Sequence, residues 1–294
     1  MLLSSSKKMS KMNEHIEQPK YITARLQGGL GNQLFQIFTA IGLSKWFQSQ
    51  PIFMNTRVSS DYPNTYRETY YHSLLDRLEL YEEKEDEKYE WNLVDFDTVS
   101  CNPSTNNKIF GYFQNYMYFH HIAQQTIQHL QFQEKQVEAQ QRNPQILSTV
   151  PFVTNVAIHF RLGDYKYKQE HHPLMSIQYY YNSIQYLLQH CLLKKENMRC
   201  ILFYEQEDEE TVLDLVRHLR IDTFVLTSSI NDVDQFLLMS SCDVIITANS
   251  TFSWWAAYIG QTIRNTVIVT IPSRWFHTPT GNNYIVPGWL VIPS

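Results

Sequence analysis

The chain has 294 residues, of which 43% are hydrophobic and 18% charged, an ordinary composition for a folded globular protein. Its formal net charge of −5, from 24 basic and 29 acidic residues, excludes broad electrostatic attraction to nucleic acid or to an anionic membrane. The four cysteines form no CxxC pair, so neither a zinc cluster nor a secreted disulfide framework is predicted. Any anion that the protein binds must therefore meet local groups.

The N-terminal part of the sequence predicts a tail followed by a strand, a turn and a helix. Residues 1–20 are polar and lack an apolar stretch long enough for a signal peptide or a membrane span, so we expect a disordered tail. The strand-like segment 21–26 runs into the glycine-rich turn 27–33, and apolar residues at helical spacing continue to residue 47. A second strand is predicted at 51–55. This order is typical of an α/β fold.

The pattern is less regular between residues 57 and 108. Within it, segment 79–90 holds seven acidic residues against two lysines, and we interpret it as a solvated surface rather than an acidic docking patch. A strand is predicted at 108–113, and a helix rich in Gln and His extends from there to about residue 140.

The polar stretch 138–151 contains two prolines and no periodicity, and it predicts a domain boundary. We therefore expect an N-terminal α/β domain over residues 21–145 and a C-terminal, Rossmann-like domain over residues 150–294. There is no internal repeat of solenoid length.

The C-terminal domain alternates short apolar segments with segments of helical spacing. Strands are predicted at 153–160, 199–205, 222–228, 243–249 and 266–272, and helices at 175–190, 207–219, 233–242 and 251–260. Such alternation predicts a parallel sheet with helices on both faces. We therefore predict two doubly wound domains that face each other across a cleft.

Three polar segments follow predicted strands, at 27–33, 159–165 and 248–253. Ligands of parallel sheets collect at the carboxyl ends of the strands, where the N-terminus of the next helix attracts anions. The glycine-rich turn matches neither GxGxxG nor the P-loop, so alone it indicates a tight turn and a ligand-binding loop equally well. Together the three segments predict one anion site.

Arg161 is the most informative residue of the second segment. Its planar guanidinium can form paired hydrogen bonds to phosphate oxygens and stays charged at any working pH. His159 could donate to a base or a phosphate, and Asp164 could orient either side chain or serve only as a turn residue. The alternative is a surface ion pair between Arg161 and Asp164, which would contribute little.

The third segment contains more short hydrogen-bonding side chains than a helix cap requires. They are Asn249, Ser250, Thr251 and Ser253.

Two Asp-x-Asp motifs, at 95–97 and 232–234, could hold Mg²⁺ or Mn²⁺ against a diphosphate. The first lies in the irregular region, and the second is expected to open a helix as its cap and as a partner of the helix dipole. We therefore predict no metal site, and we expect Arg161 and backbone amides to balance the charge of a bound anion.

Five motifs, in order, resemble those of the α-1,2-fucosyltransferases of glycosyltransferase family 11. They are GGLGNQLFQ, GYFQNYMYF, VAIHFRLGDY, LLMSSCDVIITANSTFSWWAAYIG and IPSRWF. The resemblance implies a two-domain GT-B-like fold, GDP-fucose as the donor substrate and no metal or other cofactor. It also implies inverting transfer of L-fucose to a glycan hydroxyl, through an α-1,2 linkage to galactose, with the N-terminal domain on the acceptor side.

The resemblance also assigns roles by position. It implies that Arg161 binds the β-phosphate of the donor and stabilises the leaving GDP, with His159 beside the nucleotide. We also expect Asp164 and Asn249 at the donor site. The remaining positions line the diphosphate and fucose pocket or approach it from the N-terminal domain: Ser250, Thr251, Phe252, Gly28, Gly29, Gly31 and Asn32.

The sequence departs from the family pattern twice. Leu162 stands where a second arginine is usual, and YEQED at 204–208 replaces a small acidic SDD stretch, which leaves nucleotide or sugar specificity open. The general base is also open between Asp164, Glu170 and a water relay.

Two alternatives remain beside the fucosyltransferase prediction. One is a glycosyltransferase that uses a different nucleotide-deoxysugar donor, and the other is a catalytically inactive nucleotide- or glycan-binding protein. Without the membrane anchor of animal members, the chain resembles the soluble bacterial or viral type. We therefore expect a cytoplasmic protein without a nucleic-acid partner, while the acceptor glycan and the oligomeric state stay open.

Overall fold

The computed structural model describes most of the chain. The described residues are 20–54, 58–59, 66–67, 69–81, 91–95, 101–102, 104–167, 169–191, 193–219, 221, 223–277 and 283–294. Two segments discussed above lie mostly outside the described residues. Of the expected tail at 1–20 only residue 20 is described, and of the acidic segment 79–90 only the first three residues are.

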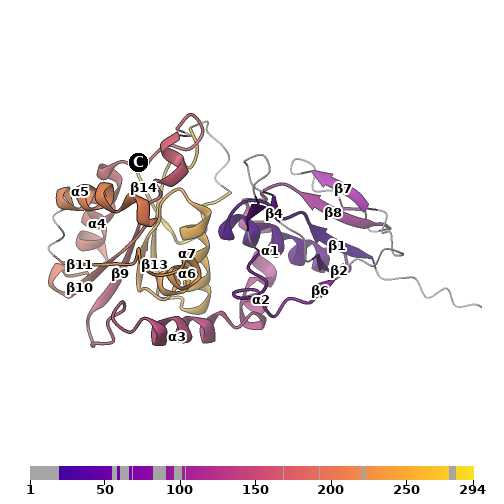
Figure 1. Ribbon diagram of the computed structural model, residues 1–294, viewed down its shortest axis with the longest axis horizontal. Helices are drawn as coiled ribbons and strands as arrows, with labels where there is room; N and C mark the ends of the chain where they lie inside the picture. The colour runs from indigo at the N-terminus through magenta and orange to yellow at the C-terminus, as the bar shows by residue number, and fades with distance from the viewer. Residues whose placement is uncertain are drawn as a thin grey trace, which may run out of the picture.

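The N-terminal half contains a parallel sheet in the order β2-β1-β8-β7 (Figure 1). Its strands are β1 (Tyr21–Ala24), β2 (Gln50–Pro51), β8 (Asn106–Phe110) and β7 (Trp91–Asp95). Helix α1 (Leu30–Trp46) joins β1 to β2 and buries most of its surface, as its apolar spacing predicted. Strand β7 was not predicted and lies in the region interpreted as irregular.

The strand predicted at 51–55 is two short strands. Strand β2 pairs with β1, whereas β3 (Phe53–Met54) pairs with β6 (Leu80–Tyr81). A further pair, β4 (Val58–Ser59) and β5 (Tyr66–Arg67), is antiparallel.

The single helix expected up to residue 140 is also divided. Two 3-10 turns, η1 (Tyr116–Tyr118) and η2 (His120–Ile122), precede α2 (Ala123–His129) and α3 (Phe132–Arg142). The break is at Gln131, whose backbone is left-handed with a φ of 55°.

The C-terminal half contains a six-stranded parallel sheet in the order β11-β10-β9-β12-β13-β14. Its strands are β9 (Thr154–His159), β10 (Met198–Phe203), β11 (Phe224–Leu226), β12 (Val244–Ile246), β13 (Ile268–Pro272) and the unpredicted β14 (Leu290–Ile292). Its helices are α4 (Ile177–His190), α5 (Glu209–His218), α6 (Asp232–Ser240) and α7 (Thr251–Ile263), with 3-10 turns η3 (Gly163–Tyr167), η4 (Lys195–Asn197) and η5 (Gln206–Asp208).

Side chains of this sheet alternate between two apolar clusters, because successive residues of a strand point to opposite faces. Along β9, Val156 and Ile158 belong to the cluster that contains residues of α4 and α5. Ala157 belongs to the cluster that contains residues of α6 and α7. The predicted α/β class, with parallel sheets and helices on both faces of the C-terminal sheet, is confirmed.

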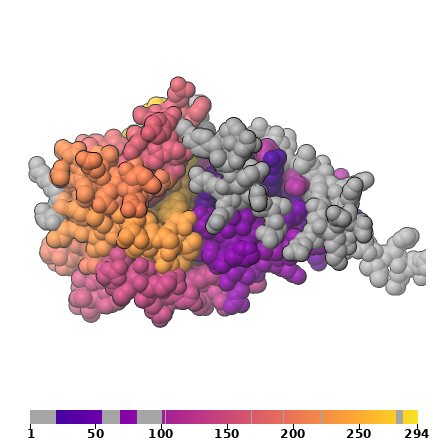
Figure 2. All heavy atoms as spheres, in the orientation of Figure 1, coloured from indigo at the N-terminus to yellow at the C-terminus, as the bar shows by residue number. Residues whose placement is uncertain are grey.

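The cluster on the α6 and α7 side continues into the N-terminal half, because α1 packs against α7. Phe38 of α1 lies 4.6 Å from Trp255 of α7 between ring centroids, and Phe35 lies 4.6 Å from Trp254. In Figure 2 the purple part of the N-terminal half touches the orange part of the C-terminal half. The boundary predicted near residue 150 stays a prediction, although α3, which precedes it, packs against α6.

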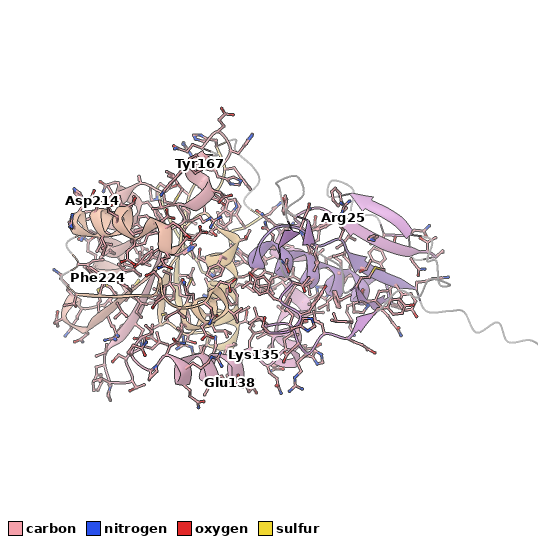
Figure 3. The ribbon with its side chains drawn as sticks, viewed as in Figure 1. Arg25, Lys135, Glu138, Tyr167, Asp214 and Phe224 are labelled. Carbon is pink, nitrogen blue, oxygen red and sulfur yellow. The ribbon has the colours of Figure 1, made fainter. Side chains whose placement is uncertain are left out.

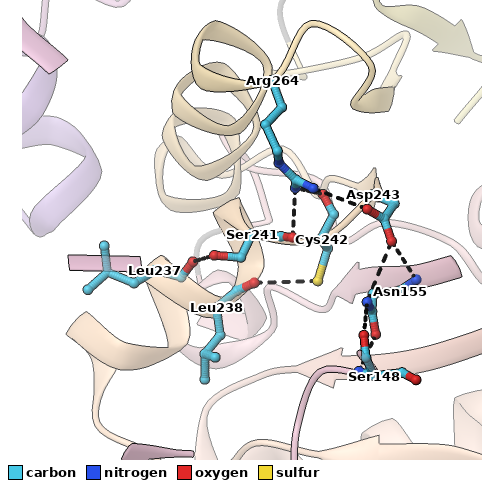
Figure 4. A network of polar contacts seen from close by, with 8 residues as sticks. All are labelled: Ser148, Asn155, Leu237, Leu238, Ser241, Cys242, Asp243 and Arg264. Atoms are coloured by element: carbon cyan, nitrogen blue, oxygen red, sulfur yellow. Dashed lines mark hydrogen bonds and ion pairs between the residues drawn. The ribbon is translucent and has the colours of Figure 1, made fainter. Parts of the chain in front are cut away.

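A polar network holds the amino ends of β9 and β12 together (Figure 4). Arg264 donates to Asp243 at 3.1 Å and to the carbonyls of Ser241 and Cys242 at the end of α6. Asp243 accepts a hydrogen bond from the backbone N–H of Asn155 at 2.9 Å. The network lies at the edge of the sheet opposite the carboxyl ends of the strands. No described helix is both long and apolar enough to span a membrane.

Candidate functional site

A cavity of about 920 Å³ lies between the two halves, at the carboxyl ends of strands from both sheets. A volume of this order is typical of sites for small organic ligands. The lining includes ten of the eleven residues expected at the site: Gly28, Gly29, Gly31, Asn32, His159, Arg161, Asp164, Ser250, Thr251 and Phe252. The structure thus brings the three polar segments together.

The N-terminal ends of α1 and α7 meet at this cavity. A Cβ atom added to Gly31, in the first turn of α1, would lie 2.3 Å from the carbonyl carbon of Thr251 in α7. Ser250 caps α7 by accepting a hydrogen bond from the N–H of Phe252, whereas Gly29 has no side chain with which to cap α1. The first turn of a helix carries N–H donors and a partial positive charge. Two such ends side by side favour an anion.

The glycine-rich turn is both a tight turn and a wall of the cavity. Gly28 has a φ of +77°, a conformation that favours glycine, and its carbonyl accepts a hydrogen bond from Gln33 at 3.1 Å. Next to it, Asn32 accepts from Gln114 at 3.4 Å, and Gln114 accepts from the indole N–H of Trp275 at 3.3 Å. This chain of hydrogen bonds joins the two halves across the cavity. Gln114 and Trp275 lie in the quoted motifs GYFQNYMYF and IPSRWF but were not expected at the site.

Arg161 is paired with two carboxylates, those of Asp164 and Glu205. Its guanidinium carbon also lies 5.1 Å from the centre of the Tyr165 ring. The ion pair with Asp164 was expected as the alternative to a binding role, but both residues line the cavity. An anionic ligand at Arg161 therefore competes with these carboxylates.

Glu205 is a site residue that the sequence reasoning missed. It follows β10, which pairs with β9, so the parallel register brings it beside Arg161. The signal was present, because Glu205 belongs to the YEQED stretch noted only as a departure. Leu162, the other departure, is 6% exposed and packs in the cluster with α4 and α5. An apolar residue at 162 is therefore explained by the core, not by the cavity.

His159 is a neutral group in this site. Burial, together with the positive charge of Arg161, lowers the pKa of His159 to about 3. Its ring lies 5.7 Å from that of Phe252 between centroids, and its Nδ1 has no hydrogen-bond partner among the described residues. A neutral imidazole has one donor and one acceptor nitrogen, but it adds no charge to the cavity.

Asn249 is the expected site residue that does not line the cavity. Its side chain is buried, and its amide donates to the carbonyls of Pro173 at 2.9 Å and Trp275 at 3.1 Å. It therefore holds two loops of the site together and lies behind its surface.

The two carboxylates of the motif 232–234 have different roles. The motif opens α6 and puts two carboxylates in its first turn, as expected, but it does not supply the cap, which is Asn231 accepting from the N–H of Asp234. Asp234 is buried and accepts two hydrogen bonds from Arg142, at 2.7 and 3.1 Å, which ties α3 to α6. Asp232 lines the cavity and accepts from the hydroxyl of Tyr70 at 2.6 Å.

The other carboxylates considered lie elsewhere. Asp95 ends β7, and the rest of the motif 95–97 lies outside the described residues. Glu170 is exposed and does not line the cavity. Of the two carboxylates considered as the general base, only Asp164 lines it. Within the described part of the chain, no group of three or more His, Cys, Asp or Glu side chains could hold a metal ion.

A model of glycosyltransferase family 11 matches residues 4–292. The chain belongs to glycosyltransferase family 11. The match confirms the family resemblance of the five motifs and identifies the enzyme class as glycosyltransferase.

Two curated relatives come from Escherichia coli. The chain is 30% identical to an α-1,2-colitosyltransferase over 146 residues, which are 47% of each protein. It is 28% identical to the O-antigen biosynthesis glycosyltransferase WbnK over 133 residues, which are 43% of this chain and 40% of WbnK. The matched regions thus span less than half of either relative. Among solved structures, an Arabidopsis thaliana FUT1 mutant in complex with GDP has 10% identity and a TM-score of 0.45, covering 83% of this chain and 69% of that one.

Proposed function

We propose that this family 11 glycosyltransferase is an inverting enzyme that moves L-fucose from GDP-fucose to a glycan hydroxyl, forming an α-1,2 linkage to galactose. The observation that supports the proposal is the convergence of Arg161 with the N-terminal ends of α1 and α7 on one cavity. Each of these three features attracts negative charge. In a nucleotide sugar that charge is carried by the diphosphate.

The chemistry requires positive charge where the leaving group departs. The bond between the anomeric carbon and the β-phosphate oxygen breaks through an oxocarbenium-like transition state, while the diphosphate gains charge. Arg161 donates paired hydrogen bonds to the β-phosphate, and the first-turn N–H groups of α1 and α7 hold the other oxygens. The acceptor hydroxyl attacks the opposite face, so β-linked fucose in the donor becomes α-linked in the product. This scheme needs no metal.

The acceptor proton needs a base within reach of the anomeric carbon. Asp164 and Glu205 both line the cavity beside Arg161. When the diphosphate occupies the guanidinium, one of these carboxylates is released and takes the proton, directly or through water.

We also propose that residues 21–145 and 150–294 form two domains that face each other across the cavity. The first contributes the turn before α1 and the end of β8 to the cavity, and we propose that this domain binds the acceptor. The second contributes Arg161 and the start of α7. A cytoplasmic location stays a prediction.

A second donor is favoured by one observation. The relative that is 30% identical over 47% of this chain is named as an α-1,2-colitosyltransferase, and colitose is also a deoxysugar. A GDP-deoxysugar other than GDP-fucose is therefore the alternative, with the same phosphate site and linkage.

The test is turnover of a panel of nucleotide sugars by the purified full chain, with lactose as acceptor and with or without EDTA. Transfer from GDP-fucose that EDTA does not reduce supports the proposal. Transfer from another GDP-deoxysugar alone supports the alternative donor. Binding of GDP without turnover of any donor points to an inactive binding protein and contradicts both.

A further inference from the structure

One exposed apolar side chain faces the cavity. Eleven large hydrophobic side chains are exposed in the described part of the chain, and among them Phe110 lines the cavity, with 41% of its surface exposed. Single exposed apolar residues are common on protein surfaces and need no explanation. An exposed ring inside a ligand-sized cavity is different, because a ligand can cover it.

The ring of Phe110 lies beside Arg25, which directly follows the neighbouring strand β1. Phe110 is the last residue of β8, and the carbonyl of the preceding Ile109 accepts a hydrogen bond from the N–H of Arg25 at 3.0 Å. The guanidinium carbon of Arg25 lies 5.2 Å from the centre of the Phe110 ring. Arg25 lies on the N-terminal half in Figure 3. The ring therefore offers a flat apolar surface at the wall of the cavity.

The position of Phe110 favours the acceptor over the donor as the ligand that covers it. The groups that attract the donor diphosphate are Arg161, whose side chain is 21% exposed, and the helix ends at Gly31 and Thr251. Phe110 is more exposed than Arg161 and comes from the strand end of the N-terminal half. It therefore lies on the half that the proposed function assigns to the acceptor.

We propose that Phe110 is the stacking platform for the terminal sugar of the acceptor and selects galactose over glucose; this inference rests on the proposed function. In galactose the hydrogens of three adjacent ring carbons project from one face of the ring, which makes that face apolar. In glucose the 4-hydroxyl lies on the same face. A phenyl ring packs well against the first face and leaves the hydroxyl of the second without a partner.

The experiment compares three variants in steady-state kinetics with saturating GDP-fucose and either lactose or cellobiose as acceptor. Phe110→Ala should raise the KM for lactose about tenfold, because it removes an aromatic contact, and should reduce the preference for lactose over cellobiose. Phe110→Trp should restore both, since it keeps an aromatic face. Phe224→Ala is the matched control: Phe224 is 37% exposed and lies at the far end of the C-terminal half (Figure 3), so both values should match the wild type.

Isothermal titration with GDP distinguishes an effect on donor binding from an effect on acceptor binding. An unchanged dissociation constant in Phe110→Ala, with a raised KM for lactose, supports the platform. An unchanged KM for lactose overturns it, and so does a rise in the KM for GDP-fucose without one for lactose. A wild-type chain that transfers no sugar from any nucleotide donor contradicts the proposed function itself, before any variant is compared.

Discussion

Gly31 of α1 and Thr251 of α7 lie backbone against backbone. A Cβ atom at residue 31 would lie 2.3 Å from the carbonyl carbon and 2.5 Å from the carbonyl oxygen of Thr251, although Gly31 itself does not have a positive φ. Glycine is therefore needed here for space. Because the two helices belong to different halves of the molecule, this contact brings two loops that are far apart in the sequence to one cavity.

The first prediction concerns this contact. Gly31→Ala should force α1 and α7 apart, with a loss of about 1–3 kcal/mol in the free energy of unfolding and a large loss of GDP affinity. Thermal unfolding and isothermal titration with GDP measure the two effects.

Gly42→Ala is the matched control. Gly42 lies in α1, like Gly31, but away from the cavity, and a Cβ atom there would lie 2.1 Å from the carbonyl oxygen of Tyr118. It should lower stability while the folded protein keeps its GDP affinity. If both variants lose stability but neither loses GDP affinity, the helix ends are not part of the donor site.

The second prediction tests the charge at the leaving group. Arg161→Ala should lower kcat for transfer from GDP-fucose by about a hundredfold or more, with a melting temperature close to that of the wild type. Arg161→Lys keeps the charge but loses the paired geometry, so its kcat should lie between that of the wild type and that of Arg161→Ala. Arg217→Ala, which removes an exposed arginine of α5, should have no effect. Near-normal transfer by Arg161→Ala would mean that the phosphate is bound elsewhere.

The third prediction follows from the pairing of Arg161 with Glu205. Glu205→Gln removes a carboxylate that competes with the diphosphate, so GDP should bind about two- to fivefold more tightly. The gain is small because the side chain of Glu205 is 51% exposed. Glu207→Gln, at an exposed position of η5, should leave GDP affinity unchanged. Weaker GDP binding by Glu205→Gln would instead indicate that the carboxylate contacts the nucleotide. If kcat falls as well, Glu205 is the better candidate for the base.

Most of the fold could be predicted from periodicity, because largely buried strands such as β9 and helices with a wide apolar face such as α1 leave clear patterns. The points where these patterns are interrupted could not be predicted. Gln131 ends a helical pattern by its backbone conformation, and β2 and β3 divide one apolar run between two partners. Strand β14 is the last element of the chain, and no helical segment follows it to complete the strand–helix alternation.

The site was predicted less completely than the fold, and for a physical reason. Residues that follow strands, such as Arg161, could be placed because parallel strands end at one edge of a sheet. Their partners depend on strand order, which periodicity does not reveal. Glu205 reaches Arg161 only because β10 is the neighbour of β9, and Asn249 turns away from the cavity toward Pro173.

The fourth prediction is a pH dependence of stability. The pKa of His159 is lowered from 6.5 to about 3, so below pH 6.5 the unfolded chain takes up a proton that the folded chain does not. Stability must therefore fall as the pH decreases from 6.5 toward 3, by up to about 1.4 kcal/mol per pH unit from this group. His159→Asn lacks the titrating ring and should show a shallower slope in urea unfolding between pH 6.5 and 4.5. Equal slopes in both proteins would mean that His159 is protonated in the folded state.

The last prediction separates the structural carboxylate of the motif 232–234 from a metal ligand. Burial by itself raises the pKa of Asp234, but hydrogen bonds from Arg142 and Asn143 outweigh it and hold that pKa below its ordinary value. Asp234→Asn should therefore weaken the contact between α3 and α6, with a loss of about 1–3 kcal/mol in the free energy of unfolding. This range is at the low end for buried pairs because the side chain of Arg142 is 52% exposed.

A metal ligand at this position would behave differently. If Asp234 held Mn²⁺ or Mg²⁺ against the diphosphate, Asp234→Asn would lose activity that added metal partly restores, and EDTA would inhibit the wild type. We expect neither, since both oxygens of Asp234 already accept hydrogen bonds from Arg142. Transfer per folded molecule should stay near the wild-type value at a temperature where the variant is folded. Arg142→Ala should reproduce the loss of stability, because it removes the other partner of the same pair.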